Sequence, residues 1–212
     1  MNKAGTTTTL SSGLNPSTFG QSVTFTATVS VVAPGAGTPA GTVNFFDGAT
    51  LIGSGAVSGN QATLTTSTLA AGIHGVIAVY AGDSNFNGST STTLTQTVNK
   101  ASTTTLVTSS LNPSLFGNSV TFTATVSTVA PGAGVATGTV NFFRDATLLG
   151  SGTLNGSGVA SFSTSSLPAG VGSITAVYAG SGNFNGSTSP AISQIVNQAP
   201  IITSANTATF QT

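Results

Sequence analysis

The chain has 212 residues, and its three basic and three acidic side chains cancel and make up only 3% of it. An ordinary globular protein carries about 25% charged residues. Without net charge or a Lys/Arg cluster, the chain has no electrostatic hold on a phosphate backbone or on an anionic membrane surface. We therefore expect neither nucleic acid nor membrane insertion. The length suits two small sandwich domains of roughly 100 residues each.

The residue types present favour a folded, extended-strand protein. Disordered chains are usually highly charged and poor in aromatics, whereas this chain has 12 Phe in alternating patterns. Its lack of cysteine excludes disulfides and thiolate metal sites. No apolar run approaches the roughly 20 residues of a membrane span, and Met1-Asn2-Lys3 leads into Ala-Gly-Thr-Thr rather than an apolar signal core.

Apolar residues recur with a period of two, which predicts strands with one buried face. The first clear case is residues 23–29, where Val, Phe and Ala alternate with Thr. The same alternation gives, in chain order, Val43/Phe45, Ala62/Leu64, Val76/Ala78/Tyr80 and Leu94/Val98. Turn residues separate these runs, with positive φ expected at Asp47-Gly48, Ser58-Gly59-Asn60, Ala71-Gly72 and Asn87-Gly88. Many short strands at this spacing predict a β-sandwich.

The whole pattern occurs twice. Leu14-Asn15-Pro16-Ser17 returns as Leu111-Asn112-Pro113-Ser114, an offset of 97 (112 − 15), and residues 41–46 return at 138–143. Ala78-Val79-Tyr80-Ala81-Gly82 returns at an offset of 98 (176 − 78), so one residue was inserted near Asn155 to Gly158. The second copy shows the matching strands at 120–126, Val140/Phe142, Ala160/Phe162, Ile174/Ala176/Tyr178 and Ile192/Val196.

We therefore predict an all-β chain of two tandem β-sandwich domains, end to end. Repeat one covers residues 1–99 and repeat two covers 100–198, joined by the short linker Val98-Asn99-Lys100-Ala101. The repeat stops at Ala199. Residues 199–212 are interpreted as an orphan strand, either the start of a truncated further domain or a donor strand for another molecule.

An ordered set of motifs resembles one known family. In sequence these are Thr-Thr-Thr-Thr-Leu, Asn-Pro-Ser-x-Phe-Gly, Val-Thr-Phe-Thr-Ala-Thr-Val, Gly-Thr-Val-x-Phe-Phe, Ala-Val-Tyr-Ala-Gly-Asp and Asn-Phe-Asn-Gly-Ser. Over residues 3–198 they resemble bacterial Ig-like repeat domains. The resemblance implies an Ig-type sandwich from a large secreted or surface-anchored protein of adhesin type, with other Ig-like domains of the same parent chain as neighbours.

The residues offer little for catalysis, and we predict no enzyme, no cofactor and no catalytic, cofactor-binding or metal-binding residue. The chain has no Glu, three Asp and one histidine, His74, which becomes Gly172 in repeat two. Acid–base catalysis needs paired carboxylates or a histidine with an orienting partner. We therefore interpret His74 as structural.

Two further motifs are interpreted as structural rather than functional. Residues 83–88 match the first half of a calcium loop, but Leu94 stands at the closing Glu position and repeat two has Ser181 in place of Asp83. A turn is the better interpretation. A Lys–Asn isopeptide crosslink, known from some Ig-like repeats, is not expected of Lys3 and Lys100, which lie at domain edges.

Tyr80 and Tyr178 are predicted to act as corner tyrosines, with the ring buried and the hydroxyl bonded to backbone. Asn87-Gly-Ser, Asn155-Gly-Ser and Asn185-Gly-Ser fit the glycosylation triplet but need no explanation beyond turns. Outward Thr24, Thr26 and Thr28, repeated as Thr121, Thr123 and Thr125, form an uncharged hydroxyl face, which is either ordinary β-propensity or a surface for self-association.

The function expected from the sequence is a non-catalytic spacer or stalk at an extracellular or cell-surface location. The first alternative is a subunit of a self-assembling filament or surface layer that uses Ile201 to Phe210 for strand exchange. A second alternative is a sugar- or protein-binding module that uses loops such as Val32 to Thr38, but these loops lack aromatic anchors.

Overall fold

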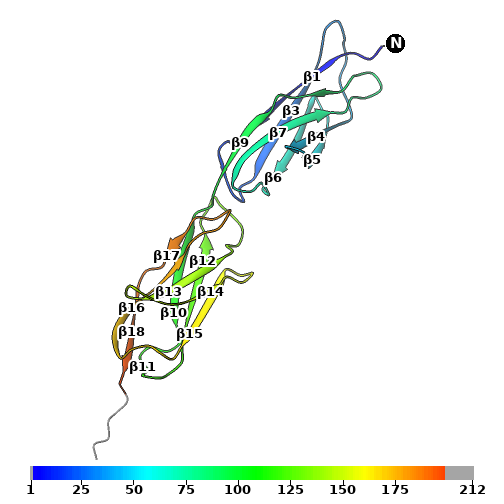
Figure 1. Ribbon diagram of the computed structural model, residues 1–212. Coiled ribbons are helices and arrows are strands. Elements are labelled where there is room, and N and C mark those ends of the chain that lie inside the picture. The colour runs from blue at the N-terminus through cyan, green and yellow to red at the C-terminus, as the bar shows by residue number, and fades with distance from the viewer. Residues whose placement is uncertain (1, 199–212) are drawn as a thin grey trace, which may run out of the picture. The chain divides into compact units, whose positions relative to one another are not determined.

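A computed structural model of the chain describes residues 2–198 (Figure 1). Repeat one contains β1 (Thr6–Ser12), β2 (Ser17–Thr18), β3 (Val23–Val31), β4 (Thr42–Asp47), β5 (Thr50–Ala56), β6 (Gln61–Thr66), β7 (Gly72–Tyr80), β8 (Ser89–Thr90) and β9 (Leu94–Asn99). Repeat two contains β10 (Thr103–Ser109), β11 (Ser114–Leu115), β12 (Val120–Thr128), β13 (Thr139–Arg144), β14 (Thr147–Thr153), β15 (Val159–Thr164), β16 (Gly170–Tyr178), β17 (Ser187–Thr188) and β18 (Ile192–Asn197). The described residues contain no helix that could cross a membrane.

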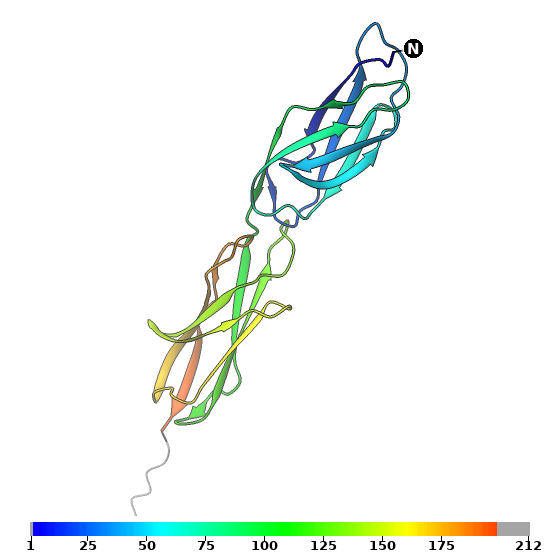
Figure 2. The same ribbon diagram turned by 45° about the vertical axis from the view of Figure 1, so that its right-hand side comes forward.

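Each repeat is a sandwich of two sheets (Figure 2). In repeat one the smaller sheet has the order β1-β3-β6, and the larger has the order β2-β9-β7-β4-β5 with β8 on β7. Repeat two has the same two sheets, β10-β12-β15 and β11-β18-β16-β13-β14 with β17 on β16. Within residues 2–198 no sheet combines strands of both repeats, and the expected pair of Ig-like sandwiches is confirmed.

The alternating pattern of β3 shows why the sheets pack face to face. Val23, Phe25, Ala27 and Val29 are buried, while the Thr residues between them face outward, because successive side chains on a strand point to opposite sides. The opposing sheet supplies Val43 and Phe45 from β4 and Val76, Ala78 and Tyr80 from β7. Burying each large side chain contributes about 1.5–3 kcal/mol. Repeat two repeats this core around Phe122 and Phe142.

The open side of each sandwich is closed by a close approach of two edge strands from different sheets. A register shift between Phe45 and Phe46 bends the β4–β5 hairpin, as a β-bulge does. A Cβ added at Gly55 of β5 would lie 2.5 Å from the Thr63 carbonyl oxygen of β6. Gly152 of β14 stands in the same relation to Ser161 of β15, at 2.6 Å. Only glycine allows the two edges to cover each other.

The turns agree with the sequence only in part. Gly48, Gly59 and Asn60 have the positive φ expected for hairpin turns, at 57°, 55° and 67°. The expectation of a positive φ at Asn87-Gly88 was wrong, since the positive φ of this loop lies earlier, at Gly82. The predicted strand at 199–212 and its donor role lie outside the described residues.

The linker is shorter than the sequence suggested. Asn99 is the last paired residue of repeat one, opposite Thr18. Ala101 is fully buried and already pairs with Phe184 of repeat two. Among the described residues, Lys100 therefore stands alone between the ladder that ends at Asn99 and the isolated bridge at Ala101.

Candidate functional site

The half-motif for calcium at residues 83–88 is a hydrogen-bonded turn. Asp83 Oδ1 accepts hydrogen bonds from the backbone N–H groups of Asn85 at 2.7 Å and Phe86 at 2.9 Å, and its Oδ2 accepts one from Ala40 N–H at 3.0 Å. The Ala40 hydrogen bond, followed by that of Asn85, holds the pKa of Asp83 below its usual value. The carboxylate thus ties the loop before β4 to the loop after β7.

The same loop holds the start of its own repeat. Ala4 N–H donates to Asn85 O at 2.8 Å, and Asn87 N–H donates to Ala4 O at 2.9 Å. The Lys3 amine donates to the Asp83 main-chain carbonyl at 2.6 Å, in an exposed position. The Asp83 carboxylate and several main-chain groups of the half-motif are therefore bonded to the protein's own chain.

Repeat two keeps this loop without the carboxylate. Ser181 N–H donates to Phe184 O at 2.9 Å, as Asp83 N–H does to Phe86 O at 3.0 Å. Lys100 Nζ donates to the Ser181 carbonyl at 2.7 Å, in the place that Lys3 takes in repeat one. The acid is dispensable for the fold of the loop, and the described residues bring together no group of three acidic, histidine or cysteine side chains that could hold a metal ion.

The two tyrosines brace a loop rather than a corner. Both rings are 1% exposed, and the hydroxyls donate to backbone carbonyls as expected, Tyr80 to Ala40 O and Tyr178 to Thr137 O, each at 2.8 Å. Their partners stand 40 residues or more upstream, before β4 and β13, so the corner assignment was wrong. Burial, followed by the charge of Asp83, raises the pKa of the Tyr80 hydroxyl.

His74 is bonded on both ring nitrogens. Nδ1 lies 2.6 Å from Asp47 Oδ2 of the neighbouring strand β4, and Nε2 lies 2.8 Å from the Ala70 carbonyl oxygen. Burial opposes protonation, but the hydrogen bond to Ala70 O and the hydrogen bond and charge of Asp47 outweigh it and raise the pKa of His74. Two acceptors facing the ring favour the doubly protonated imidazolium.

In repeat two a different side chain bonds the carbonyl equivalent to the one that His74 bonds in repeat one. Arg144 stands where repeat one has Asp47, and Gly172 where it has His74. The Arg144 guanidinium donates to the carbonyls of Pro168 at 2.5 Å and Gly170 at 3.3 Å. A Cβ at Gly172 would collide with this side chain, so the long arginine fills the histidine's space. The pair is structural, and nothing at either place resembles a nucleophile beside a base.

Sequence reasoning missed two buried glutamines, Gln96 and Gln194, both 0% exposed. Gln96 Oε1 accepts from Ser12 Oγ at 2.6 Å, and its Nε2 donates to Leu14 O at 3.0 Å. Gln194 makes the matching bonds with Ser109 and Leu111, at 2.6 and 2.9 Å. The available signal was a polar residue at an inward position between two apolar ones, repeated in both copies.

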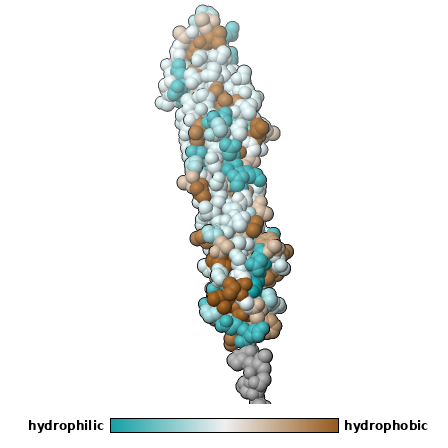
Figure 3. All heavy atoms as spheres, turned by 90° about the vertical axis from the view of Figure 1, so that its left-hand side faces the viewer, coloured by the Kyte–Doolittle hydropathy of each residue, from teal (hydrophilic) through white to brown (hydrophobic). Residues whose placement is uncertain are grey.

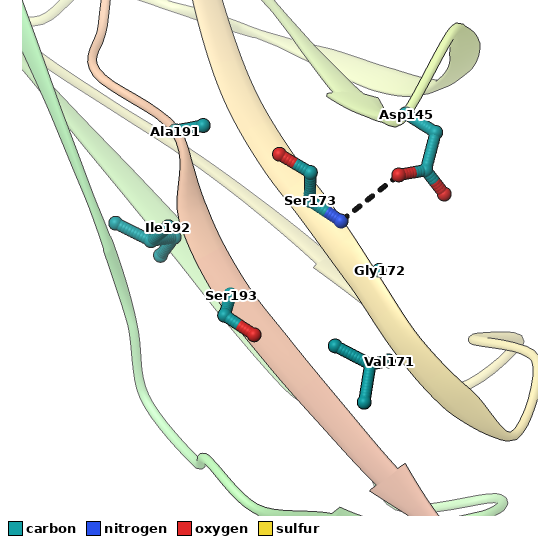
Figure 4. A pocket seen from close by; sticks show the side chains of 7 residues that line it. All are labelled: Asp145, Val171, Gly172, Ser173, Ala191, Ile192 and Ser193. Atoms are coloured by element: carbon teal, nitrogen blue, oxygen red, sulfur yellow. Dashed lines mark hydrogen bonds between the residues drawn. The ribbon is translucent and has the colours of Figure 1, made fainter.

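One shallow hollow lies on the outer face of the larger sheet of repeat two (Figure 4). Its lining comes from the β13–β14 turn, β16 and the start of β18, and consists of Asp145, Val171, Gly172, Ser173, Ala191, Ile192 and Ser193. Figure 4 shows the Asp145 carboxylate turned toward Ser173. Asp145 Oδ1 accepts a hydrogen bond from the Ser173 backbone N–H at 3.0 Å. The lining thus offers one carboxylate, already engaged, beside two hydroxyls, which does not suffice for acid–base chemistry.

The surface in Figure 3 is mostly of intermediate hydropathy, as the Ser, Thr and Gly content requires. Several hydroxyls of the smaller sheets bond to each other, for example Thr24 to Thr65 at 2.9 Å and Thr121 to Ser163 at 2.8 Å. These outward hydroxyls are part of the cross-strand pairing that stabilises a sheet.

The structure thus defines a pair of Ig-type sandwich modules whose polar side chains brace their own loops. Comparison with protein families agrees: the model of the bacterial Ig-like domain (group 3) matches residues 6–99 and again residues 107–197. The chain belongs to this family.

Solved structures with a similar arrangement include modules of several bacterial proteins. The fibronectin(III)-like modules of Clostridium thermocellum CbhA are 21% identical, with 91% of this chain and 95% of that chain covered and a TM-score of 0.39. The Yersinia pseudotuberculosis adhesin InvE is 16% identical, with 88% and 58% covered and a TM-score of 0.48. The D0-D1 domain of intimin is 16% identical, with 90% and 97% covered and a TM-score of 0.34. No curated protein matches. The family assignment rests on the double family match and not on these structures.

Proposed function

We propose that the chain is a non-catalytic spacer segment of a secreted or cell-surface protein, which sets the separation of the parts on either side of it. Membership of the bacterial Ig-like family supports this location, which the resemblance to repeats of large surface proteins of adhesin type implies. Neighbouring Ig-like domains of one parent chain are then its partners.

The observation that carries the proposal is the one-residue linker. Asn99 is fixed by the β2–β9 ladder of repeat one and Ala101 by an isolated bridge to Phe184 of repeat two, so only Lys100 lies between these two paired residues. A flexible Gly/Ser linker of many residues would let two modules diffuse independently. A single residue offers few backbone torsions for such motion, which suits a chain whose task is to keep a distance.

The filament alternative depends on a free sheet edge, and contacts between the two sheets lie at several of the described edges. Gly55 and Gly152 bring β5 and β14 into contact with the neighbouring edges β6 and β15. On the other side, the β1 hydroxyls of Thr6 and Thr8 bond to Ser89, at 2.8 and 2.7 Å. Such contacts hinder an incoming strand from extending the ladder at these places.

Light scattering after size-exclusion chromatography tests the proposal against assembly. The full chain and a version ending at Gln198 are compared from micromolar to millimolar concentration. A spacer predicts monomer mass for both. Growth of the full chain alone would replace the proposal with strand exchange by the tail, and growth of both would move assembly to a surface of the repeats themselves.

A further inference from the structure

The opening segment of each repeat runs beside its closing segment over the whole length of the repeat. The contacts in repeat one join Ala4 to Asn85 and Asn87, Thr6 and Thr8 to Ser89, Ser12 to Gln96, Asn15 to Thr95 and Thr97, Ser17 to Val98, and Phe19 to Asn99. Residue numbers rise along both partners together. The two segments are therefore parallel, although they stand about 80 residues apart in the chain.

Asn15 extends the short parallel ladder between β2 and β9 with its side chain. Its Nδ2 donates to Thr95 O at 2.7 Å, and its Oδ1 accepts from Thr97 N–H at 3.0 Å. A carboxamide carries the same donor and acceptor as a peptide group. Asn15 thus contributes two hydrogen bonds to β9, in the manner of one more residue of β2.

Gln96 fastens the same two segments from the inner side. It comes from β9, and its buried amide reaches back to Ser12 and to the Leu14 carbonyl, at 2.6 and 3.0 Å. Beyond these side chains, Ser17 pairs with Val98, and Phe19 N–H donates to Asn99 O at 2.8 Å. Hydrogen bonds to the closing strand thus recur from residue 12 to residue 19.

Repeat two carries the same attachment, so the contacts are not peculiar to one copy. Asn112 Nδ2 donates to Ser193 O at 2.6 Å, and Asn112 Oδ1 accepts from Ile195 N–H at 2.9 Å. Gln194 bonds to Ser109 and to Leu111 O, and Phe116 N–H donates to Asn197 O at 2.8 Å. The amides recur although their neighbours change from Thr97 to Ile195.

We propose that this attachment is a clamp that makes each repeat resist tension applied along the chain, with Asn15 and Gln96 as its side chains in repeat one and Asn112 and Gln194 in repeat two. Pulling acts on the start of the opening segment and on the end of the closing strand. Because the two are parallel, tension slides them past each other in opposite directions. Their evenly spaced hydrogen bonds are then loaded together instead of opening one after another.

The clamp is a property of each repeat by itself and adds resistance to tension to the proposed spacer. It is tested on single molecules, whereas the spacer is tested by mass and by distance, so the two can fail separately. The chain has no cysteine, so tags at its two ends give unambiguous attachment.

Single-molecule force spectroscopy on the full chain provides the test. Asn15→Ala removes two bonds of the clamp, and we expect one of the two unfolding events to become about tenfold faster at a given force, equivalent to about 1.4 kcal/mol of barrier. The other event should not change. Asn112→Ala should do the same to the other repeat, and the double variant should accelerate both.

Tyr80→Phe is the matched control, because it removes a hydrogen bond of the same repeat that lies outside the clamp. Its unfolding in denaturant should be affected comparably, but its unfolding rate under force should change less than about twofold. Equal acceleration by Tyr80→Phe and Asn15→Ala would overturn the clamp and reduce Asn15 to general stability. Should Asn15→Ala not fold, Asn15→Asp keeps the acceptor and loses the donor, and an acceleration of less than about twofold would equally overturn it.

Discussion

At the residue scale, the two repeats show one local requirement met by two chemistries. The carbonyl of Ala70 in repeat one is bonded by His74, and the equivalent carbonyl of Pro168 in repeat two is bonded by Arg144. The histidine needs Asp47 to hold its second nitrogen, whereas the guanidinium has five donors and needs no partner acid. The exchange leaves a histidine, whose charge changes between about pH 5 and 8, in repeat one alone.

This difference predicts a pH dependence confined to repeat one. The pKa of His74 is raised by folding, so its contribution is fully present below the unfolded histidine value of about 6.5 and is lost as pH rises through the higher folded value. Urea unfolding at pH 5.5 and 8.5 should show that His74→Gln costs repeat one more at pH 5.5. The cost of Arg144→Gln in repeat two should be the same at both values. A larger cost of His74→Gln at pH 8.5 would contradict the assignment.

The tyrosine hydroxyls give a second prediction at this scale. Tyr80→Phe leaves the Ala40 carbonyl without its partner and should lower the unfolding free energy of repeat one by about 0.5–1.5 kcal/mol. Tyr178→Phe should do the same to repeat two through Thr137. Hydrogen exchange followed by mass spectrometry assigns the loss to a repeat, and a loss shared equally by both repeats would contradict separate bracing.

At the scale of elements, the close approach of β14 to β15 depends on a missing side chain. Gly152→Ala places a Cβ 2.6 Å from the Ser161 carbonyl and should cost repeat two about 1–3 kcal/mol, because the two edges must separate. Gly156→Ala, in the following turn with nothing within 4 Å, should stay within about 0.5 kcal/mol of the parent. Thermal unfolding of both variants makes the comparison, and similar melting temperatures would show that the strands are not held in contact.

The alternating strands could be predicted from the sequence because burial on one face imposes a period of two, as in β3. The amide attachment could not. The inward position of Gln96 between two apolar residues marks a buried amide but not its partner, which lies more than 80 residues away in the chain. Nothing local marks Asn15 as a side chain that substitutes for a backbone group. The hydroxyl bond of Tyr80 was foreseen, but its partner Ala40 depends on how the loop before β4 returns to β7. These features depend on pairing between residues far apart in the chain, and a local residue pattern does not predict such pairing.

At the scale of the whole molecule, the chain consists of two members of one family, and their differences include side chains that brace loops. Asp83 becomes Ser181 and His74 becomes Gly172, and each exchange leaves the sandwich unchanged. What both copies retain is the pair of sheets, the amide clamp and the docking of Ala4 or Ala101 onto the Asn-Phe-Asn-Gly loop. These are the features that a spacer needs, and none of them is a reactive group.

The most direct test of the spacer is the distribution of distances between the repeats, measured by pulsed electron paramagnetic resonance. Ser58→Cys and Ser157→Cys place one label at an exposed hairpin of each repeat, in a chain with no cysteine of its own. The account predicts a single narrow distribution for the parent linker, and a broad one when Gly-Ser-Gly-Ser is inserted after Lys100. A parent distribution as broad as that of the insertion variant would show that the repeats move independently and would contradict the spacer.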